Sequence, residues 1–107
     1  MTTFDEREQA LEEKFVHDEE LRFRITARRD KLLAQWAATR FGLAKAAELA
    51  LISNLLAVRG GAGHDDGIRK EIATALVKCG HTIEPIELGK ALHSCEQEAL
   101  KQVMTTP

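Results

Sequence analysis

The sequence is poor in cysteine and has no long apolar segment. Its two cysteines, Cys79 and Cys95, are too few for a disulfide framework, and in a reducing compartment we expect both to be free thiols. No apolar run approaches the roughly 18 residues of a membrane-spanning helix, and no apolar signal region follows Met1. These absences predict a soluble, unprocessed, cytoplasmic protein with no direct membrane insertion. A length of 107 residues allows one domain and at most a tail.

Strand patterns are also missing. No segment alternates apolar and polar residues with a period of two, and none is a run of β-branched residues. Apolar residues instead recur at helical spacing between residues that begin or end helices. Gly42 and Gly80 are typical of helix C-termini, Pro85 suits a first helical turn, and residues 59–67 form a glycine-rich loop. The sequence therefore predicts an all-α fold, a small bundle of about four helices over residues 19–107.

Three segments supply the predicted core of this bundle. Residues 43–58 are apolar on nearly every side, which predicts the buried centre of the bundle. Asp65 or Asp66 is expected to cap the helix that follows. The apolar faces expected on the last two helices are, in order, Ile68, Ile72, Ala75, Leu76 and Cys79, then Leu88, Leu92, Cys95, Ala99 and Val103.

Motifs for catalysis, cofactors and metals are absent. There is no Ser-His-Asp pattern, and the glycine-rich loop lacks both the Gly-Lys-Ser/Thr ending and the preceding strand of a P-loop. Cys79, His81, His93 and Cys95 have side chains that suit zinc, but one residue between the members of each pair is not the usual spacing of zinc ligands. We therefore expect no enzyme activity, no cofactor and no metal site.

The charges, in contrast, are strongly segregated along the chain. Residues 1–20 contain eight acidic and two basic residues, whereas residues 21–45 contain seven basic residues and one acidic residue, Asp30. The two segments carry −6 and +6 within a chain whose formal net charge is −2. Such polarity is typical of an interaction segment, and the overall balance does not favour nucleic acid as the principal partner.

Residues 1–18 are predicted to form a separate N-terminal arm. Thr3 and Glu6 have the spacing of a capping box, and Phe4, Leu11 and Phe15 form a narrow apolar stripe on a charged helix. Three apolar side chains are a thin anchor against the entropy cost of ordering the segment. We therefore expect the arm to be partly disordered or loosely docked in the free protein and fully helical only against a partner.

A second stripe follows the arm, out of phase with the first. Leu21, Ile25, Leu32 and Trp36 share one helix face, which predicts a fresh helix start near Asp18. Arg28 falls at the centre of this stripe. Two interpretations of Arg28 remain open, namely a snorkelling side chain or a specific contact with a carboxylate or phosphate.

Residues 3–38 resemble the zeta subunit of the alphaproteobacterial F-type ATP synthase, a small inhibitor of ATP hydrolysis. The resemblance covers about a third of the chain and departs from the family pattern at Asp30 and Ala34, where Asn and Gly are usual. Its most specific pieces are Phe4-Asp5-Glu6-Arg7-Glu8, Lys14-Phe15, His17-Asp18-Glu19-Glu20-Leu21, Arg28-Arg29, Lys31-Leu32-Leu33 and Trp36-Ala37-Ala38. The resemblance implies a regulatory subunit that is held peripherally at the inner membrane through the synthase.

A shorter resemblance points to the same function. Arg7-Glu8-Gln9-Ala10 and Glu12-Glu13-Lys14-Phe15 are similar to the inhibitory helix of the mitochondrial ATPase inhibitor protein. Together the two resemblances imply that the arm binds between subunits of the catalytic head of the synthase and approaches its rotor. By position, the shorter resemblance implicates Glu12 and Phe15, and also Glu8, Glu13 and Lys14. Together with the apolar stripe, the contact residues expected are Phe4, Arg7, Glu8, Leu11, Glu12, Glu13, Lys14 and Phe15.

The alternative function belongs to another class. The basic residues between positions 22 and 31 suit a small helical module that binds nucleotide or nucleic acid. The candidate contacts for a phosphate or carboxylate are Arg22, Arg28, Arg29 and Lys31. Weak nucleotide binding through the same cluster is also compatible with an inhibitor, so only an effect on ATPase activity separates the two hypotheses.

Overall fold

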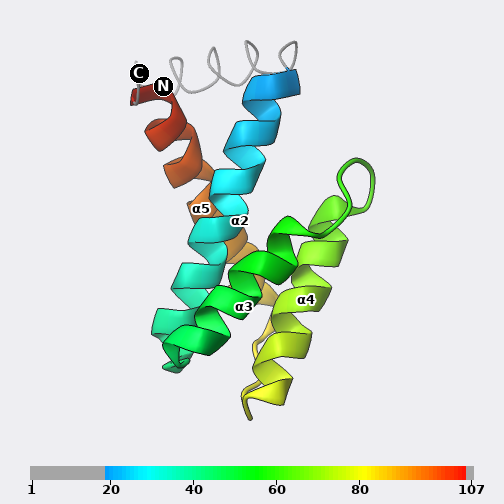
Figure 1. Ribbon diagram of the computed structural model, residues 1–107, viewed down its shortest axis with the longest axis vertical. Helices are drawn as coiled ribbons and strands as arrows, with labels where there is room; N and C mark the ends of the chain where they lie inside the picture. The colour runs from blue at the N-terminus through cyan, green and yellow to red at the C-terminus, as the bar shows by residue number, and fades with distance from the viewer. Residues whose placement is uncertain (1–18, 106–107) are drawn as a thin grey trace.

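The computed structural model describes residues 19–105, and in this part of the chain it contains four helices and no strand. The helices are α2 (Glu19–Phe41), α3 (Lys45–Leu56), α4 (His64–Lys78) and α5 (Pro85–Thr105), as Figure 1 shows. The prediction of an all-α bundle is confirmed. The predicted arm, residues 1–18, lies outside the described residues. None of the four helices described is both long and apolar enough to cross a membrane.

Local sequence signals set several helix ends. α2 ends where Gly42 adopts a φ of +65°, so that the Leu43 N–H donates to the Ala38 carbonyl at 2.9 Å. Gly80, with a φ of +83°, ends α4 in the same way, and there the His81 N–H donates to the Leu76 carbonyl at 2.8 Å. Both contacts close the helix end as in a Schellman motif. α5 begins at Pro85, as predicted.

The start of α4 differs from the prediction. Gly63, with a φ of +83°, occupies the N-cap position, and no side chain caps the helix. Asp65 and Asp66 lie inside the first turn instead. The prediction that Asp65 or Asp66 caps α4 is therefore wrong. The Asp65 side chain bonds to α2 instead, in a tertiary contact, described below, that the local sequence does not reveal.

α2 is the central element of the bundle. It packs against α5, α3 and α4, and in Figure 1 α5 runs antiparallel to it while α3 crosses in front. Ala34, Ala37 and Ala38 are buried on α2, and their small side chains let the neighbouring helices approach closely. The largest buried side chains of the core are Leu33, Leu51, Leu55, Ile68, Ile72 and Leu76.

The prediction that residues 43–58 form the buried centre is wrong. On α3 only Leu51 and Leu55 are buried, whereas Leu49 and Leu56 are more than half exposed. α3 is a short helix of 12 residues that packs on α2 and α4 and leaves its remaining face open. An apolar surface all round a helix therefore marks a candidate for burial but does not say how many neighbours will cover it.

The buried face of α2 also differs from the predicted stripe. Ile25 is buried, but Leu21, Leu32 and Trp36 are only partly buried and lie along one edge of the buried face. The centre of that face follows Leu33, the alanines and two charged residues, Arg29 and Asp30. A search for large apolar residues misses such a face.

The two C-terminal helices follow their predicted pattern more closely. Ile68, Ile72 and Leu76 are buried on α4, although Cys79, just past its end, is exposed. On α5 the predicted face is buried, and it also includes Ala91 and Leu100. The predicted members are Leu88, Leu92, Cys95, Ala99 and Val103.

Two adjacent leucines of α3 test which face of this helix points into the core. We expect Leu55→Ala, at a fully buried position, to lower the free energy of unfolding by about 2 to 5 kcal/mol. Leu56→Ala is the matched control, because this side chain is 54% exposed, and its cost should stay within roughly 0.5 kcal/mol. Urea unfolding followed by circular dichroism measures both. Equal costs would contradict the assignment of the α3 face that points inward.

Candidate functional site

A buried ion pair lies at the centre of α2. Arg29 and Asp30 are adjacent in sequence and both are buried. The Arg29 Nε donates to Asp30 Oδ1 at 2.9 Å, and Nη2 lies 2.9 Å from the same oxygen. Burial opposes the charge on Arg29, but Asp30 and then Asp65 outweigh it and raise the pKa of the guanidinium. The arginine therefore keeps its proton here, and its guanidinium donates to Asp30.

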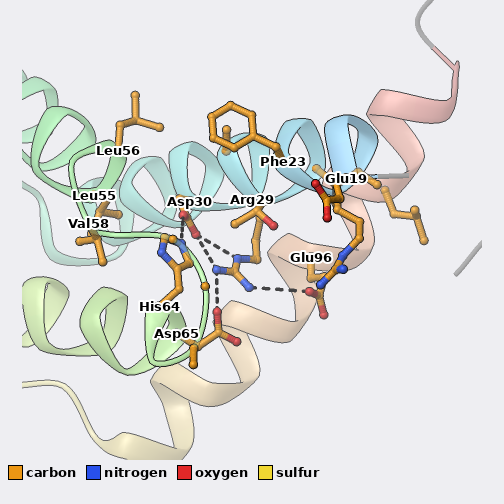
Figure 2. A pocket seen from close by; sticks show the side chains of 18 of the residues that line it. Glu19, Phe23, Arg29, Asp30, Leu55, Leu56, Val58, His64, Asp65 and Glu96 are labelled. Atoms are coloured by element: carbon orange, nitrogen blue, oxygen red, sulfur yellow. Dashed lines mark hydrogen bonds and ion pairs between the residues drawn. The ribbon is translucent and has the colours of Figure 1, made fainter. Parts of the chain in front are cut away.

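Two further carboxylates reach the same guanidinium from other helices. Arg29 Nη2 donates to Asp65 Oδ1 of α4 at 2.9 Å, and Arg29 Nη1 lies 3.7 Å from Glu96 Oε1 of α5. Figure 2 shows both carboxylates turned toward the guanidinium, Asp65 from below and Glu96 from the right. Because Asp65 and Glu96 are 59% and 53% exposed, water screens their contribution. Arg29 nevertheless links three helices, α2, α4 and α5.

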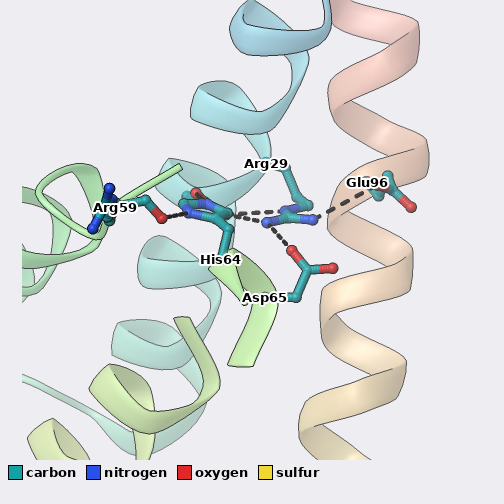
Figure 3. Close-up of polar contacts among 6 residues, drawn as sticks. Arg29, Arg59, His64, Asp65 and Glu96 are labelled. Atoms are coloured by element: carbon teal, nitrogen blue, oxygen red, sulfur yellow. Dashed lines mark hydrogen bonds and ion pairs between the residues drawn. The ribbon is translucent and has the colours of Figure 1, made fainter. Parts of the chain in front are cut away.

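His64 completes this group at the first residue of α4. Its Nε2 lies 2.9 Å from Asp30 Oδ2 (Figure 2), and its Nδ1 lies 2.9 Å from the carbonyl oxygen of Arg59 (Figure 3). The second contact joins the helix to the connection between α3 and α4, residues 57–63, here named the α3–α4 loop. We call Arg29, Asp30, His64, Asp65 and Glu96 the charged network.

The charged network forms the floor of an open groove of about 930 Å³. Phe23 and Leu56, both largely exposed, stand on its rim, as Figure 2 shows. Glu19 and Arg22 line the end of the groove at the start of α2, where the predicted arm joins the bundle. The α3–α4 loop contributes the rest of the wall through Val58, Gly60, Gly61 and Ala62.

The predicted basic cluster is divided between two sides of α2. Arg29 is buried in the charged network, and Arg22 is exposed beside the same groove. Arg28 is exposed, and its Nη1 donates to Gln102 Oε1 of α5 at 2.9 Å. Lys31 is exposed, and its position three residues after Arg28 places both on one helix face, away from Arg29. The four residues therefore do not form a single site.

The predicted contact residues of the arm lie outside the described residues, so their contribution stays a prediction. They are Phe4, Arg7, Glu8, Leu11, Glu12, Glu13, Lys14 and Phe15.

The cysteine and histidine pairs do not come together. Cys79 and His93 are exposed, His81 packs its ring on Phe41 with the centroids 5.3 Å apart, and Cys95 is buried. Burial raises the pKa of the Cys95 thiol, which keeps it protonated. Among residues 19–105, no three His, Cys, Asp or Glu side chains are grouped so as to hold a metal ion.

Sequence reasoning missed Asp30, His64, Asp65 and Glu96 as members of one network. The sequence does contain one sign that Arg29 is buried beside an acidic partner. Arg29 stands four residues after Ile25 and four before Leu33, so it shares their helix ridge, and the next residue carries the opposite charge. His64 and Glu96 carry no such signal because their partners lie far away in the sequence.

A comparison with protein families identifies the family of this chain. A family model described as ATPase inhibitor subunit zeta matches residues 1–102. No curated protein and no solved structure matches the chain. The family match includes both the arm and nearly all of the bundle, so it extends well beyond residues 3–38. The chain therefore belongs to the ATPase inhibitor subunit zeta family, and its role is ATPase inhibition.

Proposed function

We propose that the protein is a regulatory subunit that inhibits ATP hydrolysis by the F-type ATP synthase and is not itself an enzyme. Its arm enters the cleft between catalytic and non-catalytic subunits of the head and approaches the rotor. The observation that carries this proposal is the family match, because it spans the arm together with the bundle. The protein would be held at the cytoplasmic side of the inner membrane by the synthase alone, without a cofactor.

The structure of the bundle supports a protein in which the arm binds the partner and the bundle carries the arm. Helices α2 to α5 bury a core of their own, in two clusters that both contact the partly buried Leu32. Within residues 19–105, every buried side-chain nitrogen or oxygen has a hydrogen-bond partner. This core and these satisfied polar groups support a bundle that can act as the carrier of the arm. The arm is then available to a partner.

The arm sequence suits insertion into a protein cleft. Phe4, Leu11 and Phe15 would fill apolar pockets, while Glu8, Glu12 and Glu13 would meet basic groups of the head. Such a wedge stops rotation only if it binds one rotary state much more tightly than the others, since a ligand shifts an equilibrium by its differential affinity. Ordering of the arm would then accompany binding.

A truncation tests this proposal. We expect the full-length protein to inhibit ATP hydrolysis by the purified synthase head from the same source, and a form lacking residues 1–18 to lose that inhibition. The reason is that all the proposed contact residues are removed while the core of α2 to α5 is kept. Circular dichroism of the truncated form serves as the control for folding. Inhibition by the truncated form would contradict an inhibitory arm.

A second function, weak nucleotide binding, is favoured by one observation. Arg24, Arg28 and Lys31 are exposed at helical spacing on one face of α2, where they present three positive charges together. The truncation experiment also distinguishes this function. If neither form inhibits, a titration with ATP that shifts the amide NMR signals of these residues would favour the nucleotide-binding function.

A further inference from the structure

Both ring nitrogens of His64 face hydrogen-bond acceptors. The Arg59 carbonyl oxygen and Asp30 Oδ2 each lie 2.9 Å from the ring. A carbonyl accepts only, so Nδ1 must carry a hydrogen. The Asp30 carboxylate accepts from the Arg29 guanidinium through Oδ1 and faces the ring with Oδ2, which also accepts only, so Nε2 must carry a hydrogen too. Only the imidazolium form satisfies both contacts.

We propose that His64 is a pH-sensitive latch, whose imidazolium ties the α3–α4 loop and the start of α4 to the buried Asp30 of α2 and whose deprotonation releases them. The neutral ring keeps only one hydrogen, so either Nε2 faces the Asp30 carboxylate or Nδ1 faces the Arg59 carbonyl with a lone pair. The contact at that nitrogen changes from attraction to repulsion without any other change in the chain. The latch belongs to the bundle, so the inference does not depend on how the arm binds.

The charges around the His64 ring favour its imidazolium form. From α2 the ring meets Asp30 and, behind it, Arg29, while Asp65 follows it on α4 and Glu96 approaches Arg29 from α5. The α3 residues that line this groove, Leu55 and Leu56, carry no charge, and the loop faces the ring with the backbone carbonyl of Arg59. Three carboxylates thus surround one guanidinium, which leaves negative charge for the imidazolium to balance.

The expected direction of titration follows from these contacts. Burial of the ring, whose side chain is 14% exposed, opposes protonation. The hydrogen bond to Arg59 and the bond and charge of Asp30 outweigh burial and the repulsion from Arg29, and they raise the pKa of His64 above its ordinary value of 6.5. A raised pKa in the folded protein means that the stabilisation is complete below pH 6.5. It is lost as the pH rises through the pKa of the folded state.

The composition and contacts of the α3–α4 loop would let it move when the His64 ring is deprotonated. Gly60, Gly61 and Gly63 have no side chains to anchor it, and its ties to α4 include the His64 ring and a hydrogen bond from the His64 N–H to the Gly61 carbonyl at 3.1 Å. The loop forms one wall of the groove that Glu19 and Arg22 line at the start of α2. Release of the loop would therefore reshape the groove beside Glu19, the residue that follows the arm in the sequence.

NMR titration of the full-length protein tests the latch. We expect His64 to titrate with a midpoint above 6.5, and the amide signals of Gly60, Gly61 and Gly63 to change with the same midpoint. His93→Ala, at an exposed position of α5 outside the charged network, is the control variant, in which the loop signals should change as in the wild type. A His64 midpoint at or below 6.5, or loop signals that ignore it, would overturn the proposal.

Asp30→Asn is a nearly isosteric variant with an opposite expectation. The amide oxygen of the substituted side chain would accept from Arg29, and its NH₂ group would donate to Nε2 of a neutral ring. The His64 midpoint should then be lower than in the wild type by at least about one pH unit, a tenfold change in proton affinity. An unchanged midpoint would show that Asp30 does not control the ring and would refute the latch.

His64→Ala keeps the test decisive if Asp30→Asn does not fold. Hydrogen-exchange protection factors of the amides of residue 64 and Gly67, which donate to the Gly61 and Gly63 carbonyls, should be at the low, high-pH wild-type level at every pH. His93→Ala, the matched control, should retain the wild-type pH dependence. Protection of these amides in His64→Ala that still rises with acidity would mean that another group is responsible and that the proposal is wrong.

Discussion

Arg29→Ala should lower the free energy of unfolding of the bundle by roughly 3 to 5 kcal/mol, because it removes the buried guanidinium that pairs with the buried carboxylate of Asp30. The partly exposed Asp65 and Glu96 would also lose their link to α2, at a smaller cost. Urea unfolding at neutral pH measures the difference.

Arg28→Ala provides a matched control for this prediction. The two arginines are neighbours on the same helix, but Arg28 is exposed and its guanidinium donates to the neutral side chain of Gln102. Its removal should cost less than about 1 kcal/mol. Similar costs for both substitutions would contradict the view that the charged network holds α2, α4 and α5 together.

Phe15→Ala should weaken inhibition of ATP hydrolysis by more than about tenfold, equivalent to roughly 1.4 kcal/mol, and leave the unfolding of the bundle nearly unchanged. The expectation rests on the proposed function, in which Phe15 is an apolar anchor of the arm. Dose–response curves for ATPase inhibition, together with urea unfolding of the same variant, measure the two effects.

The control for Phe15 is another phenylalanine just beyond the arm. Phe23 is 73% exposed on the rim of the groove, and Phe23→Ala should leave inhibition unchanged if the bundle is only a carrier. Equal losses of inhibition in both variants would extend the binding surface from the arm onto α2. Equal losses of inhibition and stability in Phe15→Ala would contradict a separate arm.

Much of the fold was predictable because its signals are local. Gly42 and Gly80 end helices by adopting positive φ values that other residues rarely adopt, and Pro85 begins a helix where its missing N–H costs nothing. The buried face of α5 was predictable too, since its apolar residues repeat at helical spacing beside a polar surface.

The candidate site was less predictable because its contacts join distant parts of the chain. Arg29 and Asp65 are separated by 36 positions, and His64 and Asp30 by 34. Asp65 illustrates the difficulty, because its local sequence suggests a helix cap while its side chain bonds to α2 instead. No helical periodicity reveals which distant charge a given carboxylate will meet.

The sequence by itself therefore determined the helical class, most helix ends, the segregation of charge between residues 1–20 and 21–45, and the family resemblance. These properties depend on residues that are neighbours along the chain. Only the tertiary structure decided that α2 and not α3 lies at the centre, and that Arg29 is buried while Arg28 is exposed. Adjacent positions on a helix point about 100° apart, so burial depends on where α4 and α5 pack, and those helices supply the carboxylates that make a buried arginine stable.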